Sequence, residues 1–135
     1  LLGDRGHMGR DCLLADRQHS RLQVQQIAGL DKAALALSLD PSNSQILRRL
    51  LAQPGQLRLS PENAAQYSAL LPGSLKALFP SEHLLLRSVA NNGRVVMLVV
   101  ADQGGQPLND VCLQAFGKTV QCIERALGSF SRRGR

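Results

Sequence analysis

The stretch "NNGRVVMLVVADQGG", residues 91–105, decides the fold class. Asn-Gly supplies the positive φ of a tight turn, which makes the stretch the second arm of a hairpin with "HLLLRSVA", residues 83–90. Its apolar run, Val95 to Ala101, has no polar residue on either alternate face. Because side chains alternate between the two faces of a sheet, we expect a central strand with structure packed on both sides. The alternation predicts two sets, Val95, Met97, Val99 and Ala101 on one face, and Val96, Leu98 and Val100 on the other.

The rest of the chain supplies further strands and the covering helices. Residues 11–16 and 21–29 predict an opening antiparallel hairpin, and residues 56–60 predict a short strand. An amphipathic helix of about ten residues follows Ser42 or Ser44, either of which can cap it. The apolar face of that helix consists of Ile46, Leu47, Leu50 and Leu51. Helical segments are also expected at residues 60–71, 74–80 and 109–130.

Composition and charge bound the class of protein. With 135 residues, 44% of them hydrophobic and 19% charged, the chain fits one globular domain. Arginines in the tail "SRRGR", residues 131–135, supply half of the net charge of +6, and the four aromatic residues are too few for base stacking. The run from Val95 to Ala101 is far shorter than the roughly 20 residues of a membrane helix. We therefore expect neither nucleic acid nor membrane as a partner.

The cysteines and histidines give no sign of a metal or a disulfide framework. Cys12, Cys112 and Cys122 are odd in number and widely spaced, which favours a reducing cytoplasm. The three histidines have no cysteine or histidine beside them at metal-ligand spacing. We expect no metal and no cofactor.

Two phrases of the sequence carry a resemblance to a known family. "LLADRQHSRLQVQQIAGL" resembles the opening hairpin of GAF domains, and "LLLRSVANNGRVVMLVVADQGGQPLNDVCLQAFGKTVQCIERAL" resembles their closing strands and C-terminal helix. The resemblance implies an α+β fold, a GAF-like α/β/α sandwich around a central antiparallel sheet of five or six strands. Residues 1–130 would form this single domain, part of a longer protein, followed by the basic tail 131–135. A profilin-like or PAS-like sandwich is the nearest competitor, and the strand order separates them.

The resemblance implies a regulatory role, because GAF domains bind small molecules between sheet and helices or serve as dimerisation modules. "RVVMLVVAD" with "FGKTVQCIERAL" is similar to the GAF-like segments that follow HDOD domains in bacterial signalling proteins. The motifs of the cyclic-nucleotide binders and bilin binders are missing, so no ligand residues carry over. We expect a non-catalytic, cytoplasmic sensory module joined to other domains. The alternative is a thiol-dependent small-molecule reductase of GAF type.

Two arginines mark the candidate pocket, because Arg58 and Arg87 each interrupt an apolar strand. An arginine in such a place either reaches back to water or binds an anionic group. For an unidentified small molecule, the predicted polar contacts are Arg58, Tyr67 and Arg87, and the predicted walls are Leu39, Leu57, Leu59 and Leu71.

The C-terminal helix carries two adjoining stripes, one large and apolar, the other of small residues. A helix that covers a sheet needs only one such stripe, so the second is available for a homodimer. The alternative, that both stripes are used inside the same chain, stays open. The predicted dimer interface is Cys112, Ala115, Phe116, Thr119, Val120, Ile123 and Leu127.

Overall fold

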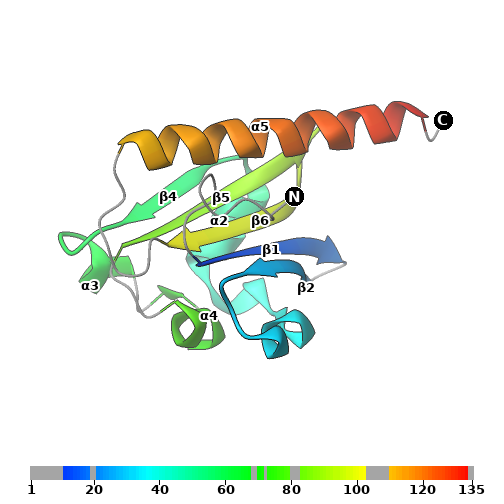
Figure 1. The fold of residues 1–135 in the computed structure, drawn as a ribbon. Coiled ribbons are helices and arrows are strands. Elements are labelled where there is room, and N and C mark those ends of the chain that lie inside the picture. The colour runs from blue at the N-terminus through cyan, green and yellow to red at the C-terminus, as the bar shows by residue number, and fades with distance from the viewer. Residues whose placement is uncertain are drawn as a thin grey trace.

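An antiparallel sheet forms the middle layer of the domain, and helices cover both of its faces (Figure 1). The computed structural model describes residues 11–18, 21–67, 70–71, 73–79, 83–102 and 110–133. The strands are β1 (Asp11–Gln18), β2 (Arg21–Ala28), β3 (Ser38–Leu39), β4 (Gln56–Leu59), β5 (Leu84–Asn91) and β6 (Arg94–Asp102). The helices are α2 (Gln45–Ala52), α3 (Ala64–Tyr67), α4 (Gly73–Leu78) and α5 (Asp110–Arg133), with 3₁₀ turns at Lys32–Ala36 and Pro41–Asn43. The predicted α+β sandwich is confirmed.

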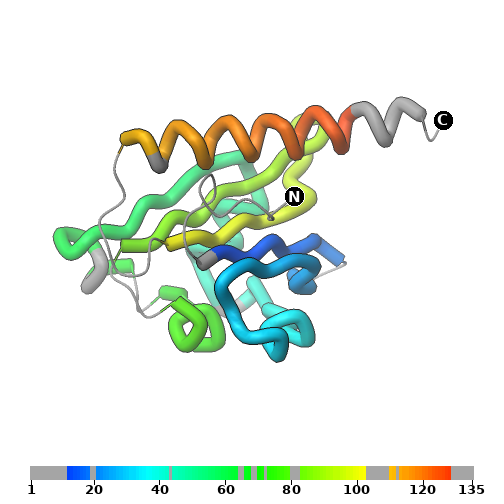
Figure 2. Tube along the Cα trace, viewed as in Figure 1, coloured from blue at the N-terminus to red at the C-terminus, as the bar shows by residue number. Residues whose placement is uncertain are grey.

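Strand β6 lies at the centre of the six-stranded sheet, whose order is β3-β2-β1-β6-β5-β4. It pairs antiparallel with β1 on one side and with β5 on the other, so the blue N-terminal strand of Figure 2 lies beside the yellow β6. Leu98 and Val100 are fully buried toward α2, whereas Val99 and Ala101 are buried toward α5. The prediction of a central strand that is apolar on both faces is therefore confirmed.

The predicted alternation fails at the start of β6. Val89 pairs with Met97, whereas the next residue of β5, Ala90, pairs with Val95, so Val96 is an extra residue that forms a β-bulge. The bulge shifts the alternation, and Val95 packs in the α2-side core with Leu98 instead of joining Met97. The assignment of Val95 to the Met97 face was wrong, because side chains alternate between the two faces only along a stretch without a bulge.

Helix α2 is fixed at both ends. Ser44 is its N-cap, since its Oγ accepts a hydrogen bond from the Leu47 amide at 3.3 Å. The four apolar residues expected on one face of the helix are all buried against the sheet. At the other end, Nη1 of Arg17 donates to the carbonyl oxygens of Leu51, at 3.2 Å, and of Val95, at 3.3 Å. A cation at a helix C-terminus is favourable, and here it also ties α2 to β6.

Helix α5 covers the opposite face of the sheet (Figure 1). Phe116, Val120 and Ile123 are at most 1% exposed there. The Glu124 carboxylate accepts a hydrogen bond from the Ala90 amide of β5 at 2.8 Å, which adds a polar tie to this apolar contact. The helix continues to Arg133, into the tail sequence. Within the described part of the chain, no helix is long and apolar enough to cross a membrane.

Candidate ligand pocket

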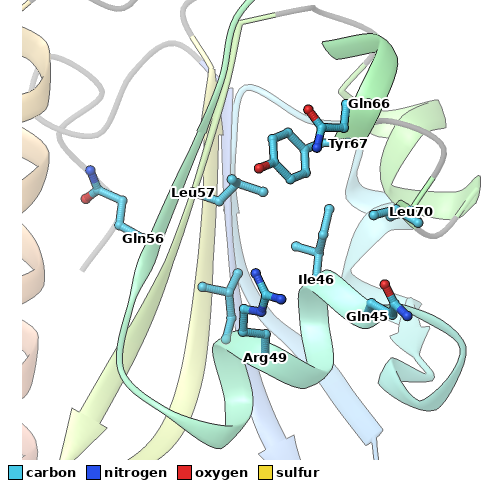
Figure 3. Close-up of a pocket in the computed structure, with 9 residues that line it drawn as sticks. Gln45, Ile46, Arg49, Gln56, Leu57, Gln66, Tyr67 and Leu70 are labelled. Atoms are coloured by element: carbon cyan, nitrogen blue, oxygen red, sulfur yellow. The ribbon is translucent and has the colours of Figure 1, made fainter. Parts of the chain in front are cut away.

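A pocket of about 320 Å³ opens between α2, β4 and α3, on the side of the sheet away from α5 (Figure 3). Its lining combines an apolar part with several polar side chains. The apolar lining residues are Ile46, Leu50, Leu57 and Leu70, and the polar ones are Gln45, Arg49, Gln56, Gln66 and Tyr67.

Helix α2 supplies the floor of the pocket. Ile46 and Leu50 lie one turn apart and are 7% and 6% exposed, so they are core residues whose outer edge faces the cavity. Arg49 flanks Ile46, because successive residues of a helix are separated by about 100°. Arg48, by the same geometry, flanks Leu51 on the other side of the apolar face and does not line the pocket. Figure 3 shows Arg49 and Ile46 pointing from α2 toward the side of Leu57 and Tyr67.

Strand β4 forms one wall. Leu57 is half-buried against the α2-side core, and Leu59, at 2% exposure, lies fully within that core. The strand pairs with β5 along its whole length, with Leu57 opposite Leu86. Figure 3 places Gln56 on the other side of the strand from Tyr67, so Gln56 contributes only to the rim.

Helix α3 holds Tyr67 over the opening. Its start is tied to β4 through Asn63, whose Oδ1 accepts from the Ser60 amide at 2.8 Å and whose Nδ2 donates to the Arg58 carbonyl at 3.1 Å. The Tyr67 amide donates to the Asn63 carbonyl at 3.1 Å, which places the tyrosine one turn further on. The ring of Tyr67 is half-buried and points toward Leu57 (Figure 3). These local bonds explain how so short a helix presents an aromatic ring at a fixed position.

The lining residues that the structure describes carry one positive charge and no carboxylate. Asp40 and Glu62 belong to neighbouring segments, but their carboxylates are engaged elsewhere. Hydrogen bonds from the side chain and the backbone of Ser42 hold the pKa of Asp40 below its ordinary value. A hydrogen bond from the Ser60 side chain likewise lowers the pKa of Glu62. Arg49 is thus the one charged side chain among the described residues of the lining.

The residues predicted for the pocket separate into three groups: lining residues, core residues outside the lining, and two arginines on the other side of the sheet. Tyr67 and Leu57 line it. Leu39, Leu59 and Leu71 are at most 6% exposed and lie in the core on the same side of the sheet, outside the lining.

Arg58 and Arg87 lie on the α5 side of the sheet. Arg58 pairs with Leu85, which belongs to the α5-side core. Nη1 of Arg87 donates to Oε1 of Gln56 at 3.3 Å, and the guanidinium lies against Gly117 of α5, where an added Cβ would be 3.3 Å from it. A second, more open cavity of about 460 Å³ includes Arg87 and Glu124. The structure does not bring these arginines together with Tyr67.

Sequence reasoning missed the contribution of α2 to the pocket. The helical spacing places Arg48 and Arg49 opposite the apolar face and gives no sign that Arg49 lies toward α3, and it makes no prediction for Gln45. The signal that could have found Arg49 is its position next to Ile46 and Leu50, at the edge of the apolar face. A polar residue at the edge of the apolar face lies at the border between the buried contact and solvent, which is where a pocket opens.

The residues predicted for a dimer seam are partly used inside the domain. Phe116, Val120 and Ile123 are buried against the chain's own sheet, and Leu127 packs at the margin of the same cluster. They are therefore not available to a second copy in this fold. Ala115 and Thr119 are half-buried, and Oγ1 of Thr119 donates to the Ala115 carbonyl at 3.0 Å. The side chain of Cys112 lies outside the described part of the structure.

Comparison with solved structures identifies the fold. Residues 122 to 287 of a methyl-accepting chemotaxis protein match with a TM-score of 0.74 at 11% identity, over 88% of this chain and 77% of that one. The GAF domain of a phosphoenolpyruvate-protein phosphotransferase from Coxiella burnetii matches with a TM-score of 0.72 at 12% identity, over 93% and 76%. A GAF domain/HD domain protein from Geobacter sulfurreducens matches with a TM-score of 0.66 at 15% identity, over 92% and 82%.

The sequence itself gives no such match. No protein-family model matches it, and no curated protein matches it either. At identities this low, the structural likeness shows the fold alone. The chain has the GAF fold, which decides against the profilin-like and PAS-like alternatives.

Proposed function

We propose that this GAF-fold chain is a non-catalytic sensory or regulatory module of a bacterial signalling protein, and that it binds a small molecule in the α2–β4–α3 pocket. The observation that carries the proposal is the pocket itself, a concave site with an apolar floor and a few converging polar groups. Small-molecule sites have this composition. The module acts in the cytoplasm as one domain of a longer protein.

The structural neighbours support a regulatory role. They include a segment of a methyl-accepting chemotaxis protein and a domain of a two-component sensor histidine kinase protein from Sinorhizobium meliloti. The Geobacter neighbour combines a GAF domain with an HD domain. On the sequence resemblance alone, we also propose that the chain is of the GAF type found after HDOD domains.

The two cysteine side chains that the structure describes do not favour the reductase alternative. Cys12 is fully buried in the core beneath α5, whereas Cys122 is exposed on α5. A thiol reductase that uses two cysteines needs them close enough to exchange a disulfide, with Cα atoms about 4.4–6.8 Å apart. Two thiols on opposite sides of a helix layer do not meet that need.

A homodimer through α5 remains part of the proposal, restricted to the residues that the sheet leaves accessible. Ala115 and Thr119 are small and half-buried, so they permit close approach of a second helix. Beside them, Cys122 and Ala126 are exposed.

A thermal-shift screen tests the binding proposal. The compounds are anionic, neutral and cationic fragments, applied to the wild type and to two variants that fill the pocket, Leu57→Trp and the more conservative exposed-site variant Gln66→Trp. A ligand present at a hundred times its dissociation constant stabilises by about 2.7 kcal/mol, which raises Tm by several degrees. We expect this rise in the wild type and its loss in both variants.

The matched control is Leu35→Trp, which adds the same ring at an exposed position outside the pocket. This variant should keep the full ligand-induced rise in Tm. The proposal fails if no fragment of any charge stabilises the wild type, or if the pocket-filling variants respond as the wild type does.

A further inference from the structure

The charge of the pocket lining restricts the class of ligand. The cation Arg49 is accompanied by side-chain amides and a phenol, and the lining residues described by the structure include no carboxylate. A cationic ligand would meet Arg49 with no opposing charge to bind it. A neutral ligand would leave the guanidinium without an ionic partner.

Within the part of the chain that the structure describes, Arg49 also has no partner for its charge. Among the described residues, none accepts a hydrogen bond from its guanidinium or forms an ion pair with it. Other arginines of the same domain do have such partners, since Arg17 donates to two carbonyl oxygens and Arg87 to Gln56. A guanidinium presents two parallel N–H donors that match the two oxygens of a carboxylate. Its location over the pocket makes it the anchor for such a group.

The opposite half of the pocket excludes a second charge. Leu57, Ile46 and Leu50 offer carbon surface on β4 and α2. The ring of Tyr67 lies above Leu57 and Ile46 in Figure 3. A second anionic group placed there would lose its hydration with no donor charge in return. At about 320 Å³, the cavity is at the lower end of the roughly 300–1,000 Å³ that ligand pockets span. The ligand is therefore small.

We propose that the pocket binds a small monocarboxylic acid with an apolar body. The carboxylate pairs with Arg49, and the hydrocarbon part lies between Leu57, Ile46 and the ring of Tyr67. The inference rests on the proposed function, since it names the ligand class of the same pocket.

The test compares acids with their uncharged amides at one ionic strength near pH 7. Benzoate and hexanoate are titrated against benzamide and hexanamide, and binding is followed by the NMR shifts of the Leu57 and Tyr67 amides. A charge-assisted hydrogen bond contributes about ten- to a hundredfold in affinity. We expect the acids to bind at least tenfold more tightly than the amides.

Three arginine variants locate the effect. Arg49→Gln should weaken acid binding at least tenfold and leave amide binding within twofold, whereas Arg49→Lys, which keeps the charge but loses the paired donors, should lie between. Arg48→Gln removes the same charge from the other flank of α2 and should change neither. Unchanged Tm values show that the variants are folded.

Three results would overturn the ligand class. If the amides bind as tightly as the acids, the pocket binds small molecules but has no preference for a carboxylate. Equal losses in the Arg48 and Arg49 variants would mean that the acids respond only to the general surface charge. If neither the acids nor benzamide and hexanamide shift the backbone amide signals of Leu57 and Tyr67, the proposed ligand class is wrong. The fragment screen with the pocket-filling variants then decides separately whether the pocket binds any small molecule.

Discussion

Ser44 is the residue whose replacement should most directly loosen the pocket. It is 2% exposed and makes two bonds, because its Oγ accepts from the Leu47 amide at 3.3 Å and donates to the Leu70 carbonyl at 2.7 Å. The first bond caps α2, which carries the pocket floor, and the second holds the segment that contributes Leu70 to the lining. Ser44→Ala removes both at once.

The size of the effect follows from the two lost bonds. Loss of an N-cap side chain costs about 1 kcal/mol, and loss of the part-buried hydrogen bond to the Leu70 carbonyl costs about 1 kcal/mol. We therefore expect Ser44→Ala to lower the free energy of unfolding by about 2 kcal/mol. Urea denaturation would show this as a lower midpoint with an unchanged slope, since the surface exposed on unfolding is nearly the same.

The matched control is Ser42→Ala, two residues earlier. The Ser42 hydroxyl is exposed, and its one bond to a described residue is to Oδ1 of Asp40, at 2.7 Å, so its loss should cost well under about 1 kcal/mol. If Ser44→Ala is no more destabilised than Ser42→Ala, the two bonds of Ser44 do not hold α2 in the way described.

Three further predictions concern acid stability, self-association and chemistry. Asp40, whose pKa is held below its ordinary 3.8, contributes stability that is complete above that value and lost as pH falls through the lower folded-state pKa. Asp40→Asn should therefore flatten the loss of stability measured by urea denaturation below about pH 4, and an unchanged acid limb would assign that loss to other groups. Thr119→Arg should shift a dimer toward monomer in ultracentrifugation across a concentration range, whereas a strict monomer at high micromolar concentration would end the dimer proposal. Replacing all three cysteines by serine should leave methionine sulfoxide reduction at the buffer rate, as in the wild type, and activity that disappears with the thiols would restore the reductase.

The central strand could be predicted because its cause is local. An apolar run on both faces has only one favourable place in a soluble sheet, and the Asn-Gly turn fixes which segment pairs with it. The N-cap of α2 and its buried face could likewise be predicted, because both depend on residues close together in the sequence. The bulge at Val96 could not be predicted, since an extra residue in one strand is recognised only from its pairing with the neighbouring strand. The two-residue strand β3 is too short to show any period at all.

The candidate site shows a different limit. Period two alone places Arg58 on the opposite face from Leu57 and Leu59, so that these residues could not all line one pocket. The prediction overlooked that consequence, and the register with β5 makes it explicit. Arg49 and Tyr67 meet only because α2 and α3 pack on the same side of β4, an arrangement that no local pattern encodes. Local sequence thus predicts on which face of the sheet a side chain lies, whereas the residues that lie opposite it across a pocket depend on tertiary packing.

The hydrogen bond between Glu124 and the Ala90 amide has a consequence for solubility. Strand β4 stops pairing at Gln56, and one further bond follows, from the Ser88 amide to the Gly55 carbonyl at 2.9 Å. Beyond that point, the described residues place no further strand on the outer side of β5. An open row of amides is a template for pairing with another unfolded or partly folded chain. The carboxylate of Glu124 occupies the next of these amides and so blocks the first step of edge-to-edge association. Helix α5 thereby protects the sheet from aggregation as well as covering its core.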